Sequence, residues 1–185
     1  MRKLLFVSSA LALALSFSTA TPYNIDDTHS AVNFQVTHMM ISDVDGAFNK
    51  FSGKIDFDEK SKALKVLEGE VEIASIDTKN DNRDKHLNAP DFFDSAKFPK
   101  ATLVMKSLKG SKLTADVTIR GVTKEVVFDF SVKGPIEHPM NKKQMIALKL
   151  EGKLNRKDFG IGMDTKDALV SDIIALRIQL EAHAQ

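Results

Sequence analysis

The chain of 185 residues contains no cysteine and no tryptophan. The absence of cysteine excludes disulfide bonds, thiol redox chemistry, thiolate metal sites and a lipid-modified N-terminal cysteine. The fold must therefore rely on its own hydrophobic core. An excess of charge of one sign is also missing, because 26 basic residues face 25 acidic ones and the formal net charge is +1. That balance suggests neither a nucleic-acid partner nor an anionic membrane surface.

Long apolar runs are scarce, and the main one lies at the N-terminus. Arg2 and Lys3 precede a mostly apolar stretch over residues 4–17, which ends in Ser18-Thr19-Ala20. This order predicts a secretory signal peptide over residues 1–20, cleaved near Ala20. The run is shorter than the about 20 residues of a comfortable membrane span. We therefore expect a periplasmic or secreted protein with no integral membrane segment in its mature chain, a single domain over residues 21–185.

Eight stretches of the mature chain alternate apolar and polar residues. In an extended strand this period of two gives one apolar and one polar face. We predict strands over residues 29–39, 48–58, 64–77, 101–108, 112–120, 124–133, 144–155 and 172–183. Eight consecutive strands with short turns can hide their edges by closing into a barrel. The sequence therefore predicts an all-β fold, an eight-stranded antiparallel barrel.

Three other segments receive different predictions. Residues 23–26 are expected to be a lead-in to the first strand. Residues 40–47 break the alternation and contain Asp45-Gly46, which predicts a short helical or loop connection. The long connection between the third and fourth strands carries no strand pattern, and Asn80 or Asp81 can cap a short helix there. Structured loops of this length often cover a mouth or line a site.

This long connection resembles the signature of the YceI-like family. The resemblance rests there on Arg83-Asp84-x-His86-Leu87, Asp91-Phe92-Phe93-Asp94 and Phe98-Pro99-x-Ala101. The family's opening is similar to Tyr23-x-Ile25-Asp26 with His29-Ser30-x-Val32-x-Phe34, its central turn to Gly121-Val122-Thr123-Lys124, and its late motif to Asn155-Arg156-x-Asp158-Phe159-Gly160. The similarity spans most of the mature chain.

The resemblance implies an exported bacterial protein with an extended lipocalin-like barrel. Its lumen would hold a long apolar molecule, such as an isoprenoid, a polyprenyl quinone-like chain or a fatty-acid derivative. The resemblance also implies that homodimers are common. The family motifs supply no nucleophile, so we expect a binding protein, not an enzyme, with no catalytic residue and no cofactor apart from the bound lipid.

The inward-facing residues of the predicted strands, with two phenylalanines of the long connection, are the candidate ligand contacts. These are Phe34, Val36, His38, Phe51, Ile55, Val71, Ile73, Phe92, Phe93, Leu103, Met105, Val117, Ile119, Phe128, Phe130, Leu148, Leu150, Ile174, Leu176 and Ile178. Small inward residues such as Gly53 and Gly152 are expected to leave volume between them. The alternative is a barrel filled by its own side chains, which eight strands permit.

The charged residues of the family motifs have two interpretations. In the first, Arg83, Asp84 and His86 bind the polar head group of a ligand at the entrance of the barrel. In the second, they form a capping and salt-bridge network that fixes the loop to the barrel. Arg156 and Asp158 carry the same two alternatives. The spacing of histidines and carboxylates matches neither zinc nor calcium motifs, so no metal site is predicted.

Two further functions remain open at this point. The first is an enzyme that acts on a lipid in the same tunnel, which needs a polar cluster in the lumen such as His38 with an adjacent carboxylate. No Gly-x-Ser-x-Gly motif indicates a hydrolase. The second is a solid-core, stress-associated barrel that binds a protein partner through its outer surface.

Overall fold

The computed structural model describes residues 20–185, which form one antiparallel sheet of eleven strands. The strands are β1 (Thr21–Ile25), β2 (Ala31–His38), β3 (Ser42–Phe48), β4 (Phe51–Asp58), β5 (Ala63–Glu72), β6 (Ile76–Asp77), β7 (Lys100–Lys109), β8 (Lys112–Ile119), β9 (Val122–Glu137), β10 (Gln144–Asn155) and β11 (Val170–Ala184). The predicted signal peptide lies outside the described residues, apart from Ala20. No helix in the described part is long and apolar enough to cross a membrane.

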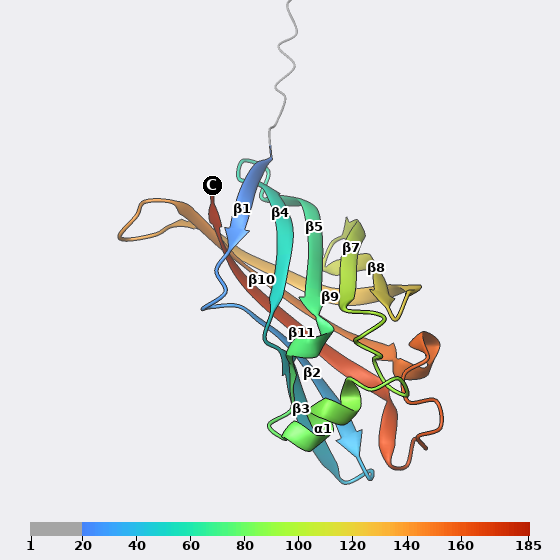
Figure 1. Ribbon diagram of the computed structural model, residues 1–185. Helices are drawn as coiled ribbons and strands as arrows, with labels where there is room; N and C mark the ends of the chain where they lie inside the picture. Colours follow the sequence, from blue (N-terminus) through green and yellow to red (C-terminus); the bar gives the residue numbers. More distant parts are fainter. Residues whose placement is uncertain (1–19) are drawn as a thin grey trace, which may run out of the picture.

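Eight of these strands close into a ring. The order is β1-β4-β5-β7-β8-β9-β10-β11, and β11 pairs again with β1. Strands β2, β3 and β6 continue the sheet beyond β11 and lengthen the barrel at one end (Figure 1). The prediction of an all-β, eight-stranded antiparallel barrel is therefore confirmed, although the eight strands of the ring are not the same eight that the alternation marks.

The difference arises because β11 pairs with two strands in succession. Its residues 170–179 face β2 and its residues 182–184 face β1. At the change of partner, the Asp26 amide donates to the carbonyl of Glu181 at 2.8 Å, and the Glu181 amide donates to Ser30 Oγ at 2.9 Å. The prediction that residues 23–26 are only a lead-in is wrong, because most of them belong to the wall strand β1.

The predicted helical or loop connection over residues 40–47 is also wrong, because most of it forms β3. Aspartate is disfavoured in strands, but the two aspartates of β3 lie on its outer face, opposite polar residues of β2. Asp43 accepts a hydrogen bond from Thr37 Oγ1, and Asp45 accepts one from Gln35 Nε2, both at 3.0 Å. Such cross-strand pairs stabilise the β2–β3 hairpin.

The predicted short helix in the long connection is confirmed as α1 (Asp81–Leu87). Asn80 caps it, because its side chain accepts a hydrogen bond from the Arg83 amide at 3.0 Å. In Figure 1, α1 lies beside β2 and β3 at the extended end of the barrel. Two short 3-10 helices complete the fold, η1 (Ile73–Ser75) and η2 (Arg156–Phe159).

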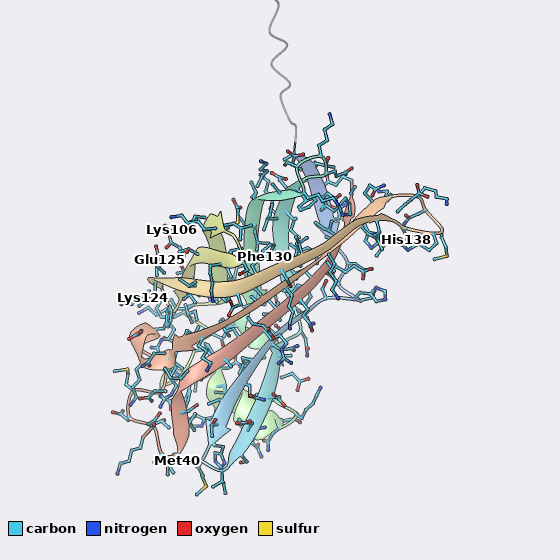
Figure 2. All side chains as sticks on the ribbon, turned by 180° about the vertical axis from the view of Figure 1, so that it is seen from behind. Met40, Lys106, Lys124, Glu125, Phe130 and His138 are labelled. Atoms are coloured by element: carbon cyan, nitrogen blue, oxygen red, sulfur yellow. The ribbon has the colours of Figure 1, made fainter. Side chains whose placement is uncertain are left out.

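The core packs solidly at one end of the barrel, around β1. Ile55, Phe57 and Leu113 have no exposed surface there, and Tyr23 closes this end with a 3.0 Å hydrogen bond to Glu59. Figure 2 places Met40, at the tip of the β2–β3 hairpin, and His138, in the β9–β10 hairpin, at opposite ends of the molecule. The larger interior cavity lies toward the β2–β3 end, because Val44 and Phe48 of β3 line it.

Candidate functional site

Two adjoining cavities occupy the barrel interior beyond the solid core. The larger has a volume of about 450 Å³, and the smaller of about 120 Å³. The larger volume lies within the ~300–1,000 Å³ typical of small-molecule sites. Five residues line both cavities, so the two meet along a shared wall: Phe48, Ala101, Ile119, Leu154 and Leu176.

The predicted contact residues divide between these cavities and the solid core. The larger cavity is lined by Phe34, Val36, His38, Ile73, Phe92, Phe93, Ile119, Ile174 and Leu176. The smaller is lined by Phe51, Val71, Leu103, Val117, Ile119, Phe128, Leu150, Leu176 and Ile178. Four candidates line neither cavity, because Ile55, Phe130 and Leu148 are buried in the solid core and Met105 packs against it. Sequence reasoning missed Val44 and Phe48 of β3, which line the larger cavity.

Another hollow of about 450 Å³ lies mostly on the outer face of β2, β10 and β11. Its lining includes the charged residues Asp129, Glu151 and Arg177. Burial of charged groups against an apolar molecule costs free energy unless each charge is paired. The interior cavities are therefore the better candidate for an apolar guest.

Gly46 on the inner face of β3 makes room for a lumen side chain. A Cβ atom here would lie 2.2 Å from Cζ of Phe34. Gly46→Ala is expected to push the Phe34 ring into the cavity and to lower the free energy of unfolding by about 1–3 kcal/mol. Chemical denaturation measures this loss. Gly69→Ala is the matched control, because the nearest atom to a Cβ there is 3.9 Å away. Equal losses in the two variants would contradict the expectation.

Arg83 and Asp84 organise the start of the helical loop around Thr78. The guanidinium of Arg83 donates from Nε to Thr78 Oγ1 at 2.7 Å and from Nη2 to the Thr78 carbonyl at 2.6 Å. The amide and hydroxyl of Thr78 both donate to Asp84 Oδ1. Arg83 and Thr78 line the larger cavity, whereas Asp84 does not. Asp84 therefore has a structural position, and Arg83 lies at the cavity wall.

His86 lies at the mouth of the same cavity and pairs with Asp91. The two side chains meet at 2.9 Å, and the hydrogen bond from His86 holds the pKa of Asp91 below its usual range. The imidazole also packs edge-on against Phe92, with 4.8 Å between ring centroids. Because Phe92 lines the cavity too, the pair fixes an apolar wall residue.

Arg156 is buried and joins the loop after η2 to the start of β11. Its guanidinium donates to Asp172 Oδ1 at 2.7 Å and to five backbone carbonyls, those of Ile161, Gly162, Thr165, Val170 and Ser171. An arginine has only five N–H donors, so this side chain is fully occupied. Asp158 in η2 is exposed and lines neither interior cavity. The geometry of Arg156 therefore supports a structural role, in which the side chain fixes the loop to the barrel, and not a contact with a head group.

Arg120 is a residue of this region that the sequence analysis did not identify. It precedes Gly121 in the β8–β9 turn and has a φ of 51°. Its guanidinium donates to the carbonyl of Phe92 and, at 2.7 Å, to the carbonyl of Gly160. It therefore connects the helical loop with the late motif. Its position next to the central turn motif was the signal available in the sequence.

A charged cluster lies where β11 changes partner. Asp26, His29 and Glu181 place potential ligand atoms within 4.8 Å of one another. His183 Nε2 lies 3.5 Å from Asp26 Oδ2 and 3.6 Å from Glu181 Oε1. We interpret the cluster as an ion-pair network that holds the β1–β2 turn on β11. The absence of a bound metal stays a prediction.

This network predicts a dependence of stability on pH. Hydrogen bonds from Thr28 and then His29 hold the pKa of Asp26 well below its usual range. The hydrogen bond and charge of Asp26 raise the pKa of His29. A lowered carboxyl pKa stabilises the fold above the unfolded value of about 3.9, and a raised imidazole pKa stabilises it below about 6.5. The stabilisation by the pair should be greatest between these two values.

We test this with the melting temperature of the wild type and His29→Gln between pH 3 and pH 9. The difference should be largest near pH 5 and should shrink both in acid and as the pH rises through the folded pKa of His29. His38→Gln is the control, because the His38 ring has no hydrogen bond or ion pair among the described residues. A difference that does not vary with pH would contradict the assignment.

Comparison with known proteins supports the barrel and its motifs. A family model described as the YceI-like domain matches residues 23–182. A UPF0312 protein of Staphylococcus aureus is 33% identical over 165 residues, which cover 89% of this chain and 96% of that protein. The crystal structure of a YceI protein of Campylobacter jejuni is 37% identical and superposes with a TM-score of 0.75, covering 80% of this chain and 90% of that one.

A more distant structure shares the fold. It is described as a polyisoprenoid binding domain from Saccharophagus degradans, implicated in plant cell wall breakdown. It is 17% identical, with a TM-score of 0.69 over 88% of this chain and 98% of that one. The match to the family model over nearly all described residues places this chain in the YceI-like family.

Proposed function

We propose that this protein binds a long apolar molecule in the two adjoining cavities and shields it from water. The observation that carries the proposal is the lining of these cavities, because the inner faces of β2, β3, β7 and β11 present apolar side chains that are only partly covered by protein. Phe34, Leu103 and Ile174 are examples, each on an inner face and each half-buried. Side chains of this kind gain free energy when an apolar guest removes them from water.

The driving force is burial of apolar surface. At ~25 cal/mol per Å² of apolar surface, removal of several hundred Å² of a lipid from water contributes on the order of 10 kcal/mol before ordering costs. A polyprenyl or isoprenoid chain, or an acyl chain, would obtain this gain. The relative that is described as binding polyisoprenoid supports an isoprenoid chain as one class of guest.

We propose binding and not catalysis. An enzyme acting inside the lumen would need a base held by a carboxylate, and the ring of His38 has no such partner among residues 20–185. The His86–Asp91 pair lies at the mouth, where both side chains are more than half exposed. Because this pair is exposed to solvent, it lacks the desolvated environment that shifts the pKa of a catalytic base.

Extraction of the purified protein tests the proposal. The protein is isolated from its native cells without detergent, extracted with organic solvent, and the extract is examined by mass spectrometry. We expect a long-chain apolar molecule in near-stoichiometric amount. An extract that contains no such molecule, together with failure of the stripped protein to bind acyl or prenyl chains, would refute the function.

We further propose that the protein is exported and that its leader is cleaved. The intact mass of the protein isolated from the periplasm or the medium should correspond to a chain beginning near Thr21. The control is a variant in which Arg2, Lys3 and the apolar run are replaced by a polar segment, which should stay in the cytoplasm at full length. Full-length wild-type protein in the cytoplasm would contradict export.

A further inference from the structure

The polar residues that line the larger cavity share one chemical property. They comprise two arginines, two histidines and two threonines, and the described lining residues include no aspartate or glutamate: the six are His38, Thr78, Arg83, His86, Arg156 and Thr165. All six offer hydrogen-bond donors, and two are cations. A cavity with this lining favours a guest whose polar part accepts hydrogen bonds or carries negative charge, and it disfavours a cation.

Two of these residues are already occupied by protein groups. All five donors of Arg156 are used on backbone carbonyls and Asp172. His86 uses its Nε2 atom on Asp91. Neither is therefore the main contact for a guest.

Arg83 differs, because its charge is held in place but not neutralised. Nε and one N–H of Nη2 donate hydrogen bonds to Thr78, which leaves three N–H donors of the guanidinium without a protein acceptor among residues 20–185. No carboxylate in the described part of the chain forms an ion pair with Arg83. Because Thr78 is 3% exposed and itself lines the cavity, the two bonds hold the guanidinium at the cavity wall.

His38 supplies a second donor with no side-chain partner. His38 is the last residue of β2, and its side chain points to the same face of the strand as the cavity-lining residues Phe34 and Val36. Its ring makes no hydrogen bond with any described residue. Arg83 from α1 and His38 from β2 thus line the same cavity from two different elements.

We propose that the guest is an amphiphile with an anionic end, a carboxylate or a phosphate monoester, that is held by Arg83 with His38 as a second donor. Its chain extends from there past Phe48 and Ala101 into the smaller cavity. This proposal rests on the proposed function and adds the chemical class of the polar end. An anion held by a fixed guanidinium fork gains charge-assisted hydrogen bonds that an ester or alcohol cannot form equally well.

Matched ligands with one chain length test the proposal. Lipid-stripped mature protein is titrated at pH 8, below the micelle concentration, with palmitate, hexadecyl phosphate, methyl palmitate, hexadecanol and hexadecylamine. We expect the two anions to bind about tenfold more tightly than the ester and alcohol, and the amine most weakly. Palmitate and hexadecyl phosphate separate a fatty acid from a phosphorylated lipid as the source of the anion.

Variants then assign the effect to Arg83. Arg83→Gln should abolish the preference for the anions, so that palmitate and hexadecyl phosphate bind no more tightly than hexadecanol, whereas His38→Gln should reduce the preference about twofold to fivefold. Lys85→Gln is the matched control, because Lys85 is an exposed cation of the same helix that does not line the cavity. Melting temperatures establish that each variant is folded.

The outcomes are distinguishable. Equal affinities for palmitate and hexadecanol in the wild type would overturn the anion proposal and leave lumen binding intact. An equal loss for all ligands in Arg83→Gln would also overturn it, because that pattern indicates a structural role for the loop. If none of the five ligands binds, the proposed function itself fails.

Discussion

Ala101→Trp is expected to weaken binding of long chains about a hundredfold and binding of short chains much less. Ala101 is a half-buried residue of β7 and lines both cavities, so an indole at this position would block the passage between them. Each methylene excluded from an apolar site costs about 0.8 kcal/mol. Exclusion of about four methylenes should weaken binding of a 16-carbon chain about a hundredfold.

The measurement is the affinity for a series of saturated chains of increasing length. A chain of ten carbons, which fits within the larger cavity, should lose less than a factor of ten. Ala147→Trp is the matched control, because Ala147 is exposed on the outer face of β10. Equal losses for short and long chains, or none for either, would contradict a continuous lumen.

Arg156→Met is expected to cause the largest loss of stability among single substitutions in the late motif. The side chain is 3% exposed, and its removal would leave buried carbonyls without donors and Asp172 without its closest ion-pair partner. Loss of one member of such a network costs more than the net contribution of its bonds, because the orphaned groups stay desolvated. We expect the free energy of unfolding to fall by at least about 3 kcal/mol.

Denaturation with urea measures this loss, and Arg177→Met provides the comparison. Arg177 pairs with Glu151 at 3.2 Å, but its side chain is 63% exposed, so its removal should cost less than about 1 kcal/mol. Similar losses in the two variants would show that burial of Arg156 does not determine its contribution.

The barrel itself could be predicted because alternation reports which side of a strand is buried. On β11, Ile174 and Leu176 face inward, whereas Ile173 faces outward and is 49% exposed. This relation holds for each strand separately and needs no knowledge of its partner. The position of β1 in the wall could not be predicted, because it depends on the long-range pairing of residues 23–25 with residues 182–184.

The division of the interior into a solid core and a cavity also could not be predicted from the sequence. Phe34 and Phe130 carry the same pattern, yet the first lines the cavity and the second is buried in the core. Gly152 was expected to leave volume, but the ring of Phe128 occupies its space, since a Cβ there would lie 2.6 Å from Phe128 Cδ1. Packing of this kind depends on residues that are distant in the chain.

The polar residues illustrate a different limit. Both interpretations of Arg83 and Arg156 follow from the sequence, because an arginine in a loop can hold either backbone or a ligand. Only the geometry separates them, since Arg156 uses every donor on protein groups and Arg83 keeps three.

Photolabelling tests most directly whether an apolar chain lies in the lumen. A 16-carbon fatty acid with a diazirine in mid-chain is bound, irradiated, and the labelled residues are identified by tandem mass spectrometry. We predict insertion into inner-face residues such as Phe34 and Ile174. Insertion confined to outer-face residues such as Val127 and Ile173 would contradict an internal binding site.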